Sequence, residues 1–184
     1  MITSGLSRGG RLLITTFGLG LLRPAPGTWG SIPPVVLAGV MMLLVRAGYG
    51  EGVVTIDGWD VPAWIAYHAV LVVVLVVFSG ACLVYGSAAE AHFNKKDPGS
   101  VCADETAGVC VALMLLPWSA VDSVWRGMVA LLVAFLAFRV FDIVKLPPAR
   151  GLQRHPGGVG ILLDDLVAGV QAMIVVQAVV RIVM

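Results

Sequence analysis

Charged side chains are scarce in this sequence. Asp, Glu, Lys and Arg make up 12% of its 184 residues, about half of the roughly 25% found in soluble domains. The formal net charge is only +1, so no basic or acidic excess indicates nucleic acid as a partner. The three cysteines lack the spacing of a metal site or of a disulfide framework. These absences argue against a soluble nucleic-acid-binding domain, a zinc module and a disulfide-rich secreted domain.

Apolar residues take the place of the missing charge. They make up 59% of the chain, and the mean hydropathy is +0.95, which is typical of an integral membrane protein. The length suits a single domain over residues 1–184. The pattern predicts an all-α membrane bundle of about five apolar helices, with a short hairpin as the alternative for the third and fourth. The predicted spans are residues 33–49, 63–86, 106–121, 127–145 and 163–184.

A shorter apolar run, Leu12–Leu22, lies near the N-terminus. It superficially resembles a signal peptide, but Arg23 and Pro24 follow where a small-residue cleavage site is expected. The run is also too short to cross a bilayer, which takes about 20 residues. We therefore expect an uncleaved N-terminal helix in the membrane interface.

Basic residues in the connections indicate how the bundle is oriented. Most of them fall on the side that holds the N-terminus, whereas the loop at residues 50–61 on the other side is acidic. The positive-inside rule places the basic side in the cytoplasm. The residues that carry this prediction are Arg8, Arg11, Arg23, Lys95, Lys96, Arg150 and Arg154.

Charged residues also occur at the ends of the predicted spans on this side. In a helix, Arg139, Asp142 and Lys145 follow one another at i, i+3 and i+6, so they line one stripe. Pro147 then ends the helix. Anchoring to lipid head groups explains cations at a helix end. It does not explain the carboxylate between them.

Two acidic pairs, Asp104-Glu105 and Asp164-Asp165, are predicted in the first turns of apolar helices. Favourable interaction with the helix dipole is one explanation for acids in that position. A glycine follows each pair about one turn later, Gly108 and Gly169, and would let another backbone or a ligand come close.

A loop rich in Gly and Pro precedes the first predicted span, which we expect to begin at Pro33. The loop contains Gly27, Thr28 and Ser31. Free backbone N–H groups and hydroxyls before a helix N-terminus can bind an anion. A plain turn with a helix cap is the alternative.

These motifs converge on one layer at the cytoplasmic ends of the spans. Carboxylates without a Cys/His set suit a hard cation such as Mg²⁺. Arg and Lys beside them would hold phosphate, and at a membrane face a lipid head group supplies it. This predicts phosphoryl transfer or hydrolysis, with either water or a carboxylate as nucleophile. Glu90 is a further candidate, and His92 and His155 are interpreted as solvated loop residues.

Five stretches resemble the phosphatidylglycerophosphatase A family, in the family's order and at closely similar spacing. The resemblance implies an all-helical, Mg²⁺-dependent lipid phosphatase that converts phosphatidylglycerophosphate to phosphatidylglycerol in the bacterial inner membrane. Its acidic motif positions would be Asp104, Glu105, Asp142, Asp164 and Asp165, with Arg139 and Lys145 in a matched stretch. The matching stretches are Pro26–Ser31, Lys96–Pro98, Asp104–Gly108, Phe138–Pro147 and Gly157–Gly169.

The sequence departs from the family pattern at Leu146, where the family commonly continues Lys-Pro-Trp-Pro, and at Ala103, where a bulky apolar residue is common. Two other functions stay open at this point. A small carrier could bind a cation through its carboxylates, although carrier sites usually lie near the bilayer midplane between paired repeats. A related lipid phosphotransferase could have similar residues.

Overall fold

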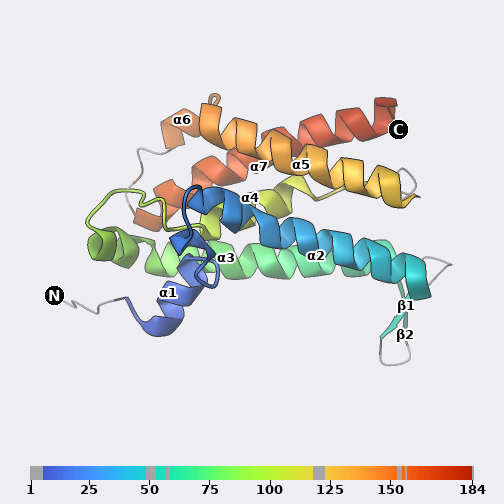
Figure 1. The fold of residues 1–184 in the computed structure, drawn as a ribbon, viewed down its shortest axis with the longest axis horizontal. Helices are drawn as coiled ribbons and strands as arrows, with labels where there is room; N and C mark the ends of the chain where they lie inside the picture. The colour runs from blue at the N-terminus through green and yellow to red at the C-terminus, as the bar shows by residue number, and fades with distance from the viewer. Residues whose placement is uncertain are drawn as a thin grey trace.

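Four long helices form the body of the protein (Figure 1). The computed structural model describes residues 6–48, 53–56, 59–117, 123–152, 155 and 157–183, so Arg154 lies outside the described residues. The long helices correspond to four of the five predicted spans, and all four are long and apolar enough to cross a membrane. They are α2 (Pro26–Gly48), α3 (Ala63–Phe93), α5 (Val124–Val144) and α7 (Gly157–Val183).

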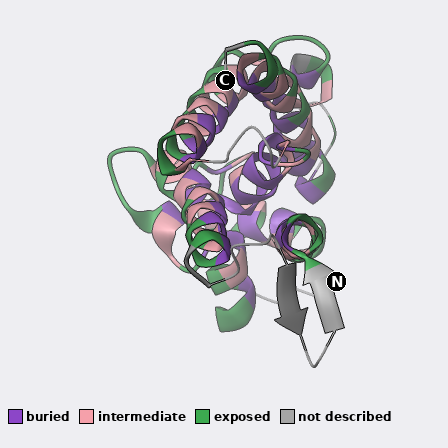
Figure 2. Cartoon of the chain, turned by 90° about the vertical axis from the view of Figure 1, so that its right-hand side faces the viewer, coloured by how far each residue is buried: buried purple, intermediate pink, exposed green. Residues whose placement is uncertain are grey.

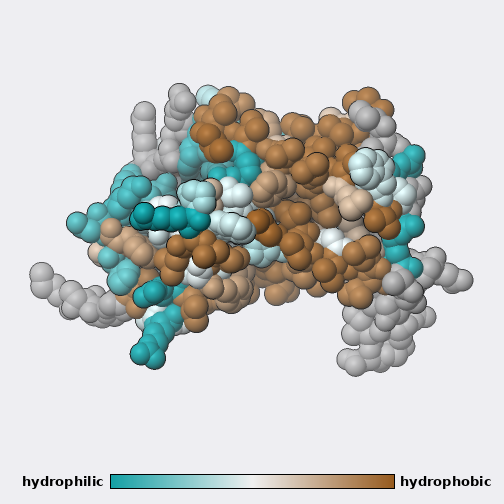
Figure 3. All heavy atoms as spheres, viewed as in Figure 1, coloured by the Kyte–Doolittle hydropathy of each residue, from teal (hydrophilic) through white to brown (hydrophobic). Residues whose placement is uncertain are grey.

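The outer surface of this bundle is hydrophobic. A band of hydrophobic residues crosses the middle of the face shown in Figure 3, with hydrophilic residues toward both ends. Large apolar side chains are exposed on every long helix, for example Val40, Val76, Leu132 and Ile174. The buried residues gather on the inner faces of the helices (Figure 2). An apolar outside around a packed inside is the arrangement that a bilayer requires, so we describe the chain as a membrane protein.

The third predicted span is not a spanning helix. Residues 106–121 contain most of α4 (Ala103–Ala112), which has ten residues and lies almost entirely buried. Its end leaves backbone carbonyls without helical partners in the middle of the chain's apolar part, where other donors must satisfy them. The Tyr67 hydroxyl donates to the carbonyl of Leu113, and the Gln177 amide donates to those of Met114 and Leu115. Because these side chains satisfy the carbonyls, α4 can end after ten residues without crossing the bundle.

The first span begins earlier than predicted, because α2 starts at Pro26 and contains Pro33 and Pro34 in its interior. A proline nitrogen cannot donate to the carbonyl four residues before it. For Pro34 that carbonyl belongs to Gly30, and the buried Thr106 hydroxyl donates to it at 2.9 Å. A bond from α4 therefore replaces the missing helical one, and the predicted loop at Gly27–Ser31 is the first turn and a half of a helix.

The remaining elements lie at the two ends of the bundle. A helix does form near the N-terminus, but α1 (Arg8–Ile14) begins before the predicted run Leu12–Leu22 and ends after its first three residues, and a 3₁₀ turn η1 (Leu19–Leu21) follows. The place of α1 in the membrane interface stays a prediction. The short helix α6 (Ala149–Leu152) precedes α7. At the opposite end, β1 (Val53–Ile56) pairs antiparallel with β2 (Trp59–Pro62). Figure 1 shows α1 at the end where α2 and α7 begin and where α3 and α5 finish.

Candidate active site

Two glycines bring α4 and α7 into contact beside the acidic residues. A Cβ on Gly169 would collide with the carbonyl oxygen of Gly108, and a Cβ on Gly108 would lie 2.6 Å from the carbonyl oxygen of Asp165. Only glycine permits backbones to approach this closely. The predicted function of the glycines, close approach, is therefore confirmed, and it places the start of α4 against the acidic pair of α7.

Asp104, Glu105 and Asp165 form a carboxylate cluster at this contact. One oxygen from each lies within 4.8 Å of the others, a spacing that a single metal ion can bridge. Asp104 and Asp165 are 5% and 3% exposed. Asp104-Glu105 does occupy the first turn of α4. Asp164-Asp165 lies about two turns inside α7, which begins at Gly157, so an interaction with the helix dipole does not account for that pair.

Four carboxylate oxygens around the cluster are buried without a hydrogen-bond donor among the described residues. They are Asp104 Oδ1, Glu105 Oε2, Asp164 Oδ1 and Asp165 Oδ2. Buried polar atoms are nearly always paired, and an unpaired ionised oxygen is costlier still. The donor set of hard oxygens and these orphaned atoms fit a divalent cation bound between α4 and α7.

The electrostatics of α4 support the same interpretation. Burial raises the pKa of Glu105 and the nearby Asp165 charge raises it further, to about 8, although the hydrogen bond with Asp104 opposes the shift. Burial and the Glu105 charge likewise raise the pKa of Asp104. Like charges held this close cannot all ionise unless a positive charge joins them. A bound cation would supply that charge.

The other two predicted acids are paired with cations. Arg139 donates to Asp142 at 2.7 Å, as the i, i+3 spacing predicts. Lys145 is the residue after α5 and takes a left-handed conformation, so it leaves the predicted stripe. Its ammonium group instead donates to Asp164 on α7. Both cations thus lie at the polar end of the bundle, each held by a carboxylate.

The N-terminus of α2 also reaches this cluster. A Cβ on Gly27 would collide with the Glu105 carboxylate and would lie 3.1 Å from Arg139 Nη1. The Ser31 hydroxyl is buried and donates to the carbonyl of Gly27 at 2.8 Å. The structure therefore brings Gly27 to the site and leaves Ser31 inside the helix. A phosphate-binding role for Gly27, Thr28 and Ser31 stays a prediction.

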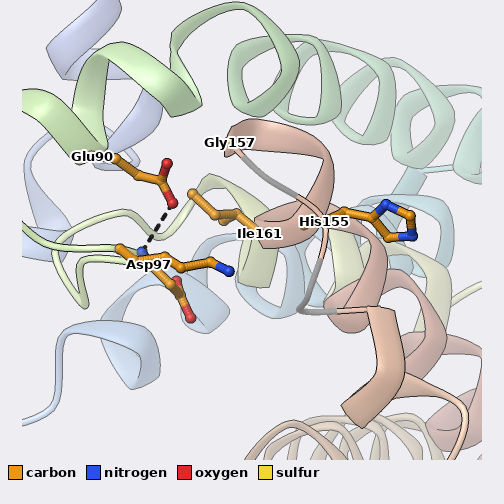
Figure 4. Close-up of a pocket in the computed structure, with 7 residues that line it drawn as sticks. Glu90, Asp97, His155, Gly157 and Ile161 are labelled. Atoms are coloured by element: carbon orange, nitrogen blue, oxygen red, sulfur yellow. Dashed lines mark hydrogen bonds between the residues drawn. The ribbon is translucent and has the colours of Figure 1, made fainter.

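A cavity of about 250 Å³ opens one turn of α7 away from the cluster. Gly160 and Ile161 line it on α7, about one turn before Asp164 and Asp165. Glu90 lines it from the last turn of α3, and Lys96 and Asp97 line it from the loop after α3. Glu90 accepts a hydrogen bond from the backbone of Asp97, and the His155 ring turns away from that pair (Figure 4). Sequence reasoning proposed Glu90 for the site but gave no place to Asp97.

Fold and site together define a helical membrane protein whose buried carboxylates and paired cations suit a metal ion and a phosphate group. The sequence profile of the phosphatidylglycerophosphatase A family matches residues 12–180. The chain belongs to this family, which is a family of phosphatases.

Individual relatives agree with the profile. The phosphatidylglycerophosphatase A of Haemophilus influenzae is 31% identical over 91% of this chain and 86% of its own length. That of Escherichia coli is 32% identical over 86% of this chain and 76% of its own length. A protein of Bacteroides thetaiotaomicron, provisionally named a phosphatidylinositol-3-phosphatase, is 32% identical over 90% of this chain and 89% of its own length. No solved structure matches the chain.

Proposed function

We propose that this protein hydrolyses the terminal phosphate monoester of phosphatidylglycerophosphate, giving phosphatidylglycerol and phosphate, and that it requires Mg²⁺. The observation that carries the proposal is the set of unpaired buried carboxylate oxygens beside two cations at the polar end of a membrane bundle. Family membership identifies the chemistry as phosphate ester hydrolysis. The names of two relatives, both phosphatidylglycerophosphatase A, suggest glycerophosphate as the head group of the lipid substrate.

Asp104, Glu105 and Asp165 would hold the metal ion, since their oxygens converge. The bound ion would polarise the phosphoryl oxygens and offset developing negative charge. Arg139 and Lys145 would bind the phosphate oxygens that the metal leaves free. Asp142 and Asp164 position these two cations through the ion pairs described above.

The hydrolytic step needs a proton acceptor. As the oxygen of water bonds to phosphorus, the bond between phosphorus and the lipid glycerol oxygen breaks, and the water proton must leave. Asp164 is the candidate acceptor, because its Oδ2 is held by Lys145 while its Oδ1 has no donor among the described residues. The glycerol oxygen takes a proton from solvent, and the products are an alcohol and inorganic phosphate.

The site would face the cytoplasm of a bacterial inner membrane. Supporting this orientation, Lys95, Lys96 and Arg23 lie in connections at the end that carries the carboxylate cluster. The lipid would then be drawn from the inner leaflet.

Phosphate release by the purified protein in detergent micelles or vesicles tests this function. We expect Mg²⁺-dependent release from phosphatidylglycerophosphate and none in excess chelator. Phosphatidylinositol 3-phosphate serves as a second substrate, because one relative carries that name. Equal release with and without chelator would contradict the metal requirement. Transfer of the phosphate to an added alcohol rather than to water, or cation flux across liposomes without hydrolysis, would favour the phosphotransferase or the carrier.

A further inference from the structure

An apolar groove runs along the outside of the bundle between α2 and α5. It consists of two adjoining hollows of about 400 and 100 Å³ that share Met128 and Leu131. Ile32 and Phe135 line the larger hollow, and its lining is entirely apolar. The smaller one continues away from the candidate site and ends at Arg46 and Ser123. Such a lining excludes a water-soluble ligand.

Two glycines contribute to the smaller hollow, because they have no side chain to fill it. Gly39 of α2 and Gly127 of α5 both line the smaller cavity. A Cβ on Gly39 would lie 3.2 Å from the Leu131 side chain, and one on Gly127 would lie 3.5 Å from the sulfur of Met42. The two helices are therefore close here, yet a depression remains between them on the side that faces lipid.

The groove leads to the candidate active site. Ile32 directly follows Ser31, and Phe135 lies one helical turn before Arg139 on the same face of α5. At about 1.5 Å per residue, the lining extends roughly 21 Å along α2, from Ile32 to Arg46. One leaflet is about 15 Å deep, which is half of a hydrocarbon core of about 30 Å. The groove is thus long enough for a whole acyl chain whose head group lies beside Arg139.

We propose that the groove between α2 and α5 holds one acyl chain of the phospholipid substrate and thereby positions its phosphate at the carboxylate cluster. This inference rests on the proposed function, because it needs a lipid whose head group reaches Arg139. Its three supports are the continuity of the groove with the site, its length and its apolar lining. Bulk lipid or a second copy of the chain in the groove are the competing outcomes.

Substitutions that fill the groove distinguish the contribution of the acyl chain to substrate binding from that of the head group. Met128 and Leu132 line it and are 52% and 56% exposed, so a larger side chain there need not disturb the core. Leu83→Trp is the matched control for Leu132→Trp, because Leu83 is 54% exposed on α3 and is not among the groove residues. The substrates are long-chain phosphatidylglycerophosphate and its deacylated, water-soluble form, assayed side by side with each variant.

We expect Met128→Trp and Leu132→Trp to lower kcat/KM for the long-chain lipid by about 10-fold or more, while hydrolysis of the deacylated form stays within about twofold. Leu83→Trp should leave both unchanged. Equal loss on both substrates, or no loss on the lipid, would overturn the acyl-chain groove. If the unmodified protein hydrolyses neither substrate, the proposed function fails, and the binding experiment below still decides the fate of the groove.

Crosslinking provides a readout that needs no turnover. Phosphatidylglycerophosphate with a diazirine at the middle of one acyl chain is bound in chelator, irradiated and mapped by mass spectrometry. We expect labels concentrated on residues 32–43 and 128–135, and loss of these labels in Leu132→Trp. Even labelling of all lipid-facing helices, or the same pattern with a diazirine phosphatidylcholine, would identify bulk lipid. Crosslinks between two chains along α5 would identify a second copy.

Discussion

At the residue scale, the site is defined by buried carboxylate oxygens that lack a hydrogen-bond donor among the described residues. Asp104, Glu105 and Asp165 converge, and each has an oxygen without a donor in the part of the chain that the structure describes. A metal-free protein must keep these groups protonated or tolerate their repulsion. Two of their neighbours, Asp142 and Asp164, are instead neutralised by Arg139 and Lys145. Under the proposed function, Asp104, Glu105 and Asp165 would hold the metal ion, whereas Asp142 and Asp164 would position the cations, and the free oxygen of Asp164 would also accept the proton.

The first prediction separates these two sets. Asp165→Asn should abolish Mg²⁺-dependent hydrolysis and also the thermal stabilisation that Mg²⁺ gives, because it removes a ligand. Asp142→Asn should lower hydrolysis by about 100-fold through loss of the Arg139 contact, yet retain most of the stabilisation by Mg²⁺. Phosphate release and thermal unfolding measure both effects. Full stabilisation of Asp165→Asn by Mg²⁺ would contradict its place among the ligands.

The second prediction concerns pH. The pKa of Glu105 rises from 4.5 to about 8 on folding without metal. Between these values the folded protein binds more protons than the unfolded chain, so its free energy of unfolding falls as pH rises. We expect Tm in chelator to drop between pH 6 and 8, and Mg²⁺ to raise Tm more at pH 8 than at pH 6. Glu105→Gln should flatten the decline in chelator, and an unchanged slope would count against this origin.

Sequence reasoning found the acids but not how they pair. Their positions at the ends of apolar runs identified Asp104, Glu105 and Asp165 because charge is scarce everywhere else. The helical spacing predicted that Lys145 lies on one stripe with Arg139. In the structure, the backbone at Lys145 is left-handed, and its side chain contacts Asp164 instead. Such a pairing across 19 residues depends on how α5 and α7 pack, which spacing along one helix does not contain.

At the element scale, the site depends on the half-length helix α4. Nearly all of α4 is buried, and it lies between α3 and α7, where a spanning helix was predicted. Its hydrophobicity was interpreted as a membrane span, because burial against protein and exposure to lipid produce similar apolar runs in a sequence. The prolines of α2 misled in a similar way, since the Thr106 hydroxyl that compensates for Pro34 lies 76 residues from Gly30.

The third prediction tests the contact between α4 and α7. Gly169→Ala should push the two backbones apart, because its Cβ would collide with the carbonyl oxygen of Gly108. Overpacking of this kind costs about 1–3 kcal/mol of unfolding free energy, and separating Asp165 from Asp104 should weaken Mg²⁺ binding as well. Gly80→Ala on α3 is the control, since its Cβ meets nothing within 4 Å. Equal behaviour of the two variants in thermal unfolding and hydrolysis would refute this role for Gly169.

At the scale of the whole molecule, the hydrophobic band separates two polar ends (Figure 3). The carboxylate cluster lies at the end where α4 and α7 begin. The overall composition made the membrane bundle predictable, because 12% charge in 184 residues leaves little surface for water. The proposed orientation in the membrane rests on the Lys and Arg residues of the connections, which can be read from the sequence as well.

The fourth prediction tests that orientation. Lys96→Cys, at the end with the site, should react with a membrane-impermeant maleimide in inverted vesicles and not in intact cells. Trp125→Cys, near the start of α5 and 70% exposed before substitution, should show the opposite pattern. The native cysteines Cys82, Cys102 and Cys110 are buried and give the background. Reaction of Lys96→Cys from outside intact cells would reverse the proposed topology.

The most direct test of the carboxylate cluster is a titration of the chelator-stripped protein with Mn²⁺, a spectroscopic substitute for Mg²⁺, followed by electron paramagnetic resonance alongside phosphate release. We predict bound Mn²⁺ whose occupancy rises with the rate of hydrolysis, and loss of both in Asp165→Asn. Hydrolysis of phosphatidylglycerophosphate at full rate with no bound metal, or Mn²⁺ bound equally well by Asp165→Asn, would contradict the account.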